Sequence, residues 1–150
     1  MSRQSPNASG VFADTFLTRA IARATAAASG IVATDADGAP AAYDNRLERP
    51  HALPSLSVGA RQVTRVELYE NGQPKAATVR LALHLLTPAS SDAPAYAGSA
   101  GASDALAELV EALARDGFSF PGTAGAQQEG ALGSAPVFET VLVPQITIPF

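Results

Sequence analysis

The stretch that most constrains this fold is residues 63–88, VTRVELYENGQPKAATVRLALHLLTP. Two runs of alternating apolar and polar residues flank an Asn-Gly pair at positions 71 and 72, which predicts an antiparallel hairpin. Asn-Gly favours a type I′ turn with positive φ at both positions, whereas Pro74 and Lys75 indicate a connection wider than two residues. We expect one face of this hairpin to lie in the core, because the returning run alternates strictly. The apolar residues of that run are Val79, Leu81, Leu83 and Leu85.

Two segments have the spacing of amphipathic helices. The first runs between an expected cap at Ser9 and an expected end at Gly30, and its apolar stripe is Phe12, Phe16, Leu17, Ile21 and Ala24. The second runs from a cap at Ser103 to an end at Gly117, with a stripe of Leu106, Leu109, Val110 and Leu113. We expect this second helix, residues 104–116, to pack on the apolar face of the hairpin.

The rest of the chain supplies shorter strands and connections. Turn residues in TDADG predict a short strand at 31–34 followed by a loop, and Gly59 indicates a bulge or bend. The C-terminal segment has β composition, with Pro144 forcing an edge position or a break. Composition predicts a loose N-terminus at 1–9 and flexible loops at 88–102 and 121–136.

Together these elements predict one domain, residues 1–150. A domain of this length buries enough surface to form a single hydrophobic core. The order of helix, strands, hairpin, helix and strands is typical of an α+β fold. We expect an antiparallel β-sheet with a long central hairpin and two α-helices packed on one face.

Composition limits the classes of function. The net charge of −4 argues against a sequence-independent grip on DNA, which needs clustered Lys and Arg. The basic concentration, interrupted by Glu48 and Glu67, consists of Arg46, Arg49, Arg61 and Arg65. It is typical of a solvated surface, with a phosphate or partner contact as the alternative. Charged residues make up 16% of the chain, below the average of about 25%. This low fraction indicates either that other subunits cover the surface or that the genome has an alanine-rich composition, and the two explanations weigh equally.

No apolar run approaches the ~20 residues of a membrane span, and the start MSRQSPNASG lacks the apolar core of a signal peptide. The chain has no cysteine, which leaves no disulfide, thiolate nucleophile or Cys-based metal site. We therefore expect no membrane association, and a cytoplasmic origin fits these features.

Residues that could carry chemistry are few and scattered. His84 shares the polar face of the hairpin with Arg80, and His51 lies in a loop without a second ligand at metal-binding spacing. Asp35 and Asp37 precede Gly38 as in a calcium loop, but no acidic residue completes the pattern, so a plain turn is expected. No nucleophile elbow or phosphate-binding glycine motif is present. We predict no catalytic, cofactor-binding or metal-binding residues, and a chain that is not an enzyme.

The series HALPSLSVGAR, RVELYENGQPKAATVRLALHLLTP and SDALAELVEALARDG, followed by a β C-terminus, resembles the tail-terminator and tail-completion proteins of tailed bacteriophages, the minor tail protein U type. The resemblance covers roughly residues 11–150 and is diffuse. It implies a small sheet carrying two helices, assembled into a hexameric ring at the tail end or neck. It also implies tail-tube and head–neck proteins as partners, DNA at most passing through the lumen without specific binding, and a virion location after assembly in the host bacterial cytoplasm.

An assembly role also fits the residues themselves. Long loops and an apolar C-terminal strand can be covered by a neighbouring subunit, although that strand could equally dock on its own sheet. We expect the turn at Asn71-Gly72 to project toward a partner. The residues expected at the partner interface are Asn71, Gly72, Gln73, Lys75, Arg80, His84, Tyr96, Ile146, Ile148 and Phe150.

Other interpretations remain open from the sequence. The chain could be a different neck or baseplate component of a phage, because none of the resembling segments is diagnostic alone. It could instead be a small non-enzymatic domain that binds a protein or ligand through its sheet face. An enzyme is the third alternative, and it would require convergent polar groups in one cleft.

Overall fold

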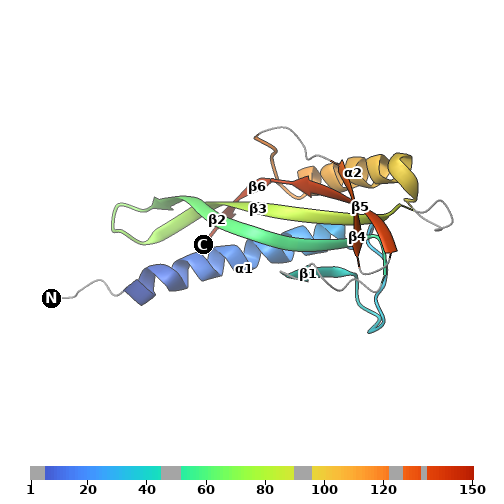
Figure 1. Ribbon diagram of the computed structural model, residues 1–150. Coiled ribbons are helices and arrows are strands. Elements are labelled where there is room, and N and C mark those ends of the chain that lie inside the picture. Colours follow the sequence, from blue (N-terminus) through green and yellow to red (C-terminus); the bar gives the residue numbers. More distant parts are fainter. Residues whose placement is uncertain (1–5, 45–51, 90–95, 122–126, 133–134) are drawn as a thin grey trace.

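The computed structural model describes residues 6–44, 52–89, 96–121, 127–132 and 135–150. Within these ranges the chain forms two helices and six strands (Figure 1). This architecture confirms the α+β prediction. The helices are α1 (Pro6–Ala28) and α2 (Gly98–Arg115). The strands are β1 (Ala42–Asp44), β2 (Ser55–Leu68), β3 (Pro74–Pro88), β4 (Gln127–Leu132), β5 (Ala135–Leu142) and β6 (Gln145–Pro149).

The β2–β3 hairpin is the centre of the sheet, whose strand order is β1-β2-β3-β5-β4. β5 and β6 follow one another along the second edge of β3, where β5 pairs with residues 83–88 and β6 with residues 76–80. All pairs are antiparallel except the short pairing of β1 with β2. The break between β5 and β6 falls at Pro144, as its missing N–H predicts, and the Pro144 carbonyl accepts a bond from the Leu81 N–H at 3.0 Å.

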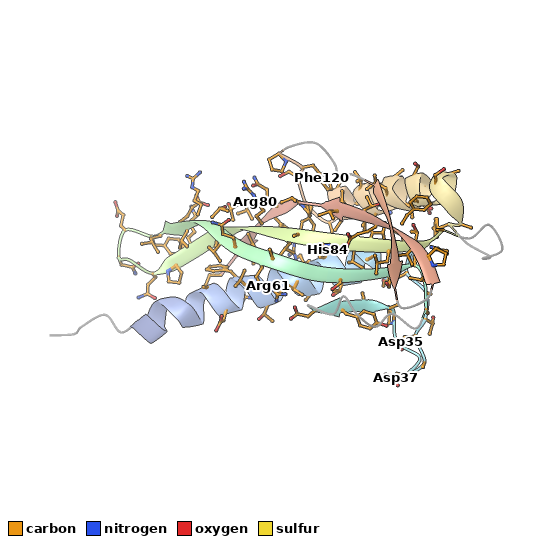
Figure 2. The ribbon with its side chains drawn as sticks, in the orientation of Figure 1. Asp35, Asp37, Arg61, Arg80, His84 and Phe120 are labelled. Atoms are coloured by element: carbon orange, nitrogen blue, oxygen red, sulfur yellow. The ribbon has the colours of Figure 1, made fainter. Side chains whose placement is uncertain are left out.

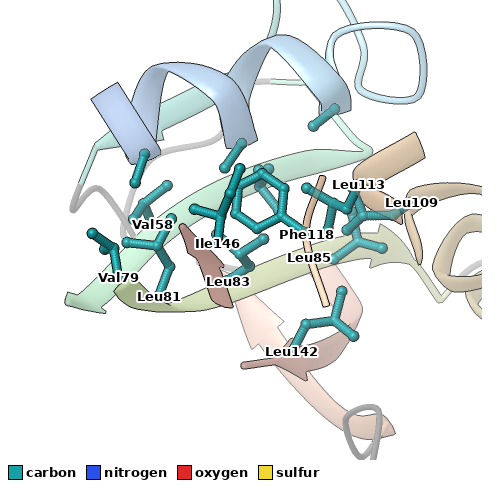
Figure 3. Close-up of a cluster of buried hydrophobic side chains, with 14 of the residues drawn as sticks. Val58, Val79, Leu81, Leu83, Leu85, Leu109, Leu113, Phe118, Leu142 and Ile146 are labelled. Carbon is teal, nitrogen blue, oxygen red and sulfur yellow. The ribbon is translucent and has the colours of Figure 1, made fainter. Parts of the chain in front are cut away.

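Both helices cover the same face of the sheet, and the hydrophobic core lies between the helices and this face (Figure 3). The four alternating apolar side chains of β3 are fully buried together with Leu109 and Leu113 of α2, which confirms the predicted packing of this helix on the hairpin. Each such burial stabilises the fold by about 1.5–3 kcal/mol. The α1 stripe that reaches this core consists of Phe16, Ala20, Ala24 and Ala28. Its alanines let the helix lie close to the sheet.

α1 starts earlier than the sequence analysis predicts. It begins at Pro6 rather than after Ser9, so the predicted loose N-terminus of residues 1–9 is wrong for residues 6–9. Proline is favoured in the first helical turn because its missing N–H has no helical acceptor there. Residues 1–5 lie outside the described ranges.

α2 also starts early, at Gly98, so the cap predicted at Ser103 is wrong. Ala97 occupies the cap position, and Ser103 lies inside the helix. Gly101 makes this start possible, because a Cβ there would lie 2.0 Å from the Tyr96 carbonyl carbon. The predicted end is confirmed: Gly117 has φ +96° and the Phe118 N–H donates to the Leu113 carbonyl at 3.0 Å.

The two predicted loops are shorter than expected. Residues 98–102 of the predicted 88–102 loop belong to α2, and residues 127–132 of the predicted 121–136 loop form β4. β4 pairs with β5 in an antiparallel hairpin. The strand predicted at 31–34 is reduced to one bridge between Thr34 and Pro40, and the short strand beside β2 is β1 instead.

Two local predictions on β2 are tested by its register. The pairing with β3 shifts between Val58 and Arg61, which confirms a bulge at Gly59. The connection to β3 is wider than two residues, as Pro74 indicates, and Gly72 alone of the Asn-Gly pair has positive φ, +84°. The type I′ expectation is therefore wrong. Asn71 keeps negative φ because its side chain accepts the Gln73 N–H at 3.1 Å.

Candidate assembly surface

The distal end of the β2–β3 hairpin, residues 66–75, is named here the ribbon tip. It is closed by short backbone bonds: the Gly72 N–H donates to the Tyr69 carbonyl at 2.9 Å, and the Tyr69 N–H donates to Gln73 at 2.8 Å. In Figure 1 the tip extends past β6 and away from α2. The turn is therefore a fixed projection from the sheet, and its shape does not depend on a partner.

The ribbon tip exposes three large apolar side chains. Val66, Leu68 and Tyr69 are 48%, 59% and 56% exposed. Val66 lies opposite Ala77, on the face of the sheet that carries the core, but at a point that the packed helices leave uncovered. Neighbouring exposed apolar groups of this kind mark interaction sites more often than solvated surface.

Charges surround this apolar group. The Lys75 ammonium lies 5.9 Å from the centre of the Tyr69 ring, which is cation–π distance. Glu70 is exposed at the turn, and the described residues offer it no ion-pair partner. The tip thus combines an exposed aromatic ring with a negative charge beside it in the sequence.

The sheet face opposite the helices carries the polar residues of β3. His84 and Arg80 both belong to this open face (Figure 2). His84 Nδ1 lies 3.2 Å from Glu139 Oε2 on β5, and Ser57 is its cross-strand neighbour on β2. Arg80 is exposed and has no ion-pair partner in the described part of the chain. Because a pairing holds His84 and leaves Arg80 unengaged, Arg80 is the better contact residue of the two.

A hollow of about 290 Å³ lies beside Arg80 on this open face. It is lined by Ala60, Arg61, Gln62, Arg80, Leu81, Ala82 and Val143. Two of these residues, Ala60 and Ala82, have small side chains, and Val143 is 44% exposed. The hollow is therefore an apolar depression with a positive charge at its rim.

Arg61 accounts for part of the basic concentration seen in the sequence. Its guanidinium forms an ion pair with Asp44 of β1 and donates to the carbonyls of Val58 and Gly59 at 3.2 and 3.1 Å. Arg61 therefore has a structural role: it provides hydrogen bonds to two carbonyl groups of β2 and links them to the last residue of β1. Arg46, Arg49 and His51 lie outside the described residues.

The residues predicted for the interface fall into different environments. The four predicted residues at the turn are exposed at the ribbon tip: Asn71, Gly72, Gln73 and Lys75. Ile146 and Ile148 are buried in the core at 3% and 1%, so their predicted role at a partner surface is wrong. β6 docks on β3 of its own sheet, which decides between the two possibilities that the sequence left open.

Phe150 and Tyr96 are the remaining predicted contacts. The Phe150 ring is half exposed and lies 5.7 Å from the Phe16 ring, while its N–H donates to the Lys75 carbonyl at 2.9 Å. Tyr96 is half buried beside α2. Its hydroxyl donates a hydrogen bond to the Glu108 carboxylate, and this bond raises the pKa of Tyr96, as does burial. Both side chains therefore have partners within the subunit, and Phe150 adjoins the base of the ribbon tip at Lys75.

Residues weighed for other chemistry have local explanations. Asp35 Oδ1 accepts the N–H groups of Asp37 and Ala39 at 2.9 and 3.3 Å, and Gly38 has φ +81°, which is the geometry of a turn. Among the described residues, no three His, Cys, Asp or Glu side chains gather closely enough to hold a metal ion. Neither described helix is long and apolar enough to cross a membrane.

The sequence analysis did not predict the exposed apolar residues of the ribbon tip and the hollow. Val66 and Leu68 continue the alternation of the hairpin, which the sequence analysis does not separate from core positions, and Tyr69 and Val143 adjoin a turn and a break. The nearness of Val66, Leu68 and Tyr69 to Asn71-Gly72 was the one signal that could have placed these three at an exposed end.

No protein-family model matches this chain, and a comparison with curated proteins finds no match.

Proposed function

We propose that this protein is a structural subunit of a tailed-bacteriophage virion, assembling into a closed homo-oligomeric ring at the tail end or neck. The observation that carries the proposal is the ribbon tip, a hydrogen-bonded turn that presents Val66, Leu68 and Tyr69 to solvent. An exposed apolar end on a long strand invites aggregation unless another subunit covers it. The order of elements, which resembles the minor tail protein U type, supports the same role.

The chemistry of the described residues supports an assembly role over catalysis. Three pairs of titratable side chains interact locally: His84 with Glu139, Arg61 with Asp44, and Tyr96 with Glu108. These pairs lie on different elements and do not converge on one cleft. The acidic net charge of −4 suits a subunit that contacts proteins while DNA passes without being bound.

The test is assembly of the purified chain, alone and with tail tubes that lack their end protein. Light scattering after size exclusion and negative-stain imaging should show a ring, expected from the resemblance to contain six copies, at the tube end. A chain that stays strictly monomeric at high concentration, with no ring beside tail tubes, would refute the proposal.

Two sets of variants separate folding from assembly. Leu83→Asp places a charge at a fully buried position and should unfold the subunit. Gln73→Ala and Lys75→Ala change exposed tip residues and should keep the fold while weakening assembly. If these tip variants form rings as readily as the unaltered chain, the tip is not part of the contact.

A further inference from the structure

The exposed large apolar side chains of the described chain are concentrated at two places. Three of the five, Val66, Leu68 and Tyr69, are on the ribbon tip, and Val143 borders the hollow on the open sheet face. The fifth, Phe150, lies against the Phe16 ring of α1, and its N–H donates to the Lys75 carbonyl at the base of the ribbon tip. The two places have opposite shapes, since one projects from the sheet and the other is recessed into it.

We propose that the ribbon tip of one copy inserts Leu68 and Tyr69 into the open-face hollow of a second copy. This inference rests on the proposed ring assembly and names the contact that builds it. The hollow has a volume of about 290 Å³, and two of the residues that line it, Ala60 and Ala82, have small side chains. Burying exposed leucine and tyrosine surface there removes the apolar area of both sites from water.

Charge complements this fit. Glu70 is beside Tyr69 on the tip, and Arg80 is at the rim of the hollow. Both are exposed, and within the described ranges neither takes part in an ion pair. Insertion of the tip therefore brings together two unengaged charges of opposite sign. Arg61, the other cation lining the hollow, is already neutralised by Asp44.

A tip cannot reach its own hollow, so the proposed insertion takes place between two copies. Arg80 lies seven positions along β3 from Gln73. A strand rises about 3.4 Å per residue, so roughly 24 Å of hydrogen-bonded strand separates the turn from the hollow. Contact between two different surfaces is head-to-tail, and such a contact forms closed rings when the rotation closes.

Mixing of two defective variants tests the contact. Leu68→Asp combined with Tyr69→Ser spoils the tip and keeps the hollow, whereas Val143→Arg fills the hollow and keeps the tip. Each variant alone should be monomeric where the unaltered chain forms rings, with self-association weakened at least about tenfold. An equimolar mixture has one intact tip and one intact hollow per pair, so it should form heterodimers and no larger species.

Controls make the outcomes decisive. Circular dichroism must show the native fold for each variant, with Ala82→Arg replacing Val143→Arg if the latter misfolds. Arg23→Glu, an exposed change on α1 outside both surfaces, should assemble normally. The charge contact is tested by Glu70→Arg and Arg80→Glu, which should each weaken assembly and restore it when combined.

The failures of the two proposals differ. If the unaltered chain never assembles, the proposed function and this contact both fail. If it forms rings but the tip and hollow variants do so equally well, the contact is wrong while the assembly role stands. Heterodimers that do not form on mixing, despite folded monomeric variants, also overturn the pairing of tip with hollow.

Discussion

The His84 ring lies directly over Gly59: a Cβ built on Gly59 would be 2.9 Å from His84 Nε2. The opposite ring nitrogen, Nδ1, faces Glu139 Oε2 at 3.2 Å. The bulge in β2 thus supplies the space in which a residue of β3 reaches a carboxylate of β5. The absence of a side chain at Gly59 therefore permits a contact that links β3 to β5 across the open face.

Gly59→Ala should therefore destabilise the protein, because the His84 ring must move and its contact with Glu139 is lost. We expect a loss of about 1 kcal/mol in the free energy of unfolding, measured by urea denaturation. Gly30→Ala is the matched control, since a Cβ there has no neighbour within 4 Å. The loss should shrink in a His84→Ala background; an undiminished loss there would show that the ring is not the cause.

Two threonines should be replaceable with a gain in stability. Thr87 and Thr140 are fully buried, and their hydroxyls have no hydrogen-bond partner among the described residues. Thr140→Val keeps the shape and removes the unsatisfied hydroxyl, so the free energy of unfolding should rise by about 1 kcal/mol. Thr78→Val is the contrasting variant, because Thr78 Oγ1 lies 3.2 Å from Thr147 Oγ1 and that bond would be lost. Thermal unfolding that ranks the two variants the other way would contradict this account.

The threonines and the ribbon tip show what the sequence could not supply. Alternation along β3 predicted the buried face correctly, because a period of two identifies the face to which each side chain points. It carries no information on whether another element covers that face at a given point. Val66 alternates like Val79 yet is 48% exposed, and Thr140 is polar yet fully buried.

The elements that the sequence analysis predicted wrongly, β4 and the start of α2, also depend on contacts that are distant from local sequence patterns. The residues of β4, QQEGAL, lack alternation and are strand only because β5 supplies hydrogen-bond partners. The early start of α2 depends on Gly101 packing against the Tyr96 backbone, a contact absent from the local signals for capping. The hollow beside Arg80 combines residues of β2, β3 and the β5–β6 break, which only the strand pairing brings together.

Arg19 should hold the C-terminal strand in place. Its Nη1 donates to the Pro149 carbonyl at 2.7 Å, and its guanidinium carbon lies 5.8 Å from the centre of the Phe150 ring. Arg19→Ala should speed amide hydrogen exchange at Thr147, Ile148 and Phe150 and lower the free energy of unfolding by less than about 1 kcal/mol, since the site is exposed. Arg23→Ala, one turn away and also exposed, should leave exchange in β6 unchanged. Equal effects from both variants would remove the specific role of Arg19.

Tyr96 should titrate above the ordinary tyrosine range. The hydrogen bond to the Glu108 carboxylate is the largest cause of its raised pKa, followed by burial and by the charges of Glu108 and Asp104. A raised folded pKa means that the native state keeps its proton where the unfolded state has lost it. This contribution to stability is therefore complete below the unfolded pKa and is lost as pH rises through the folded one.

Ultraviolet absorbance of the phenolate, in a background of Tyr43→Phe and Tyr69→Phe, measures the Tyr96 titration directly. Glu108→Gln removes the negative acceptor, so the Tyr96 pKa should fall toward its ordinary value. The alkaline loss in free energy of unfolding should shrink with it. Glu111→Gln on the same helix is the matched control, because Glu111 is not among the groups that raise this pKa. A midpoint that responds equally to both substitutions would assign the shift to the general charge of α2 rather than to the Glu108 bond.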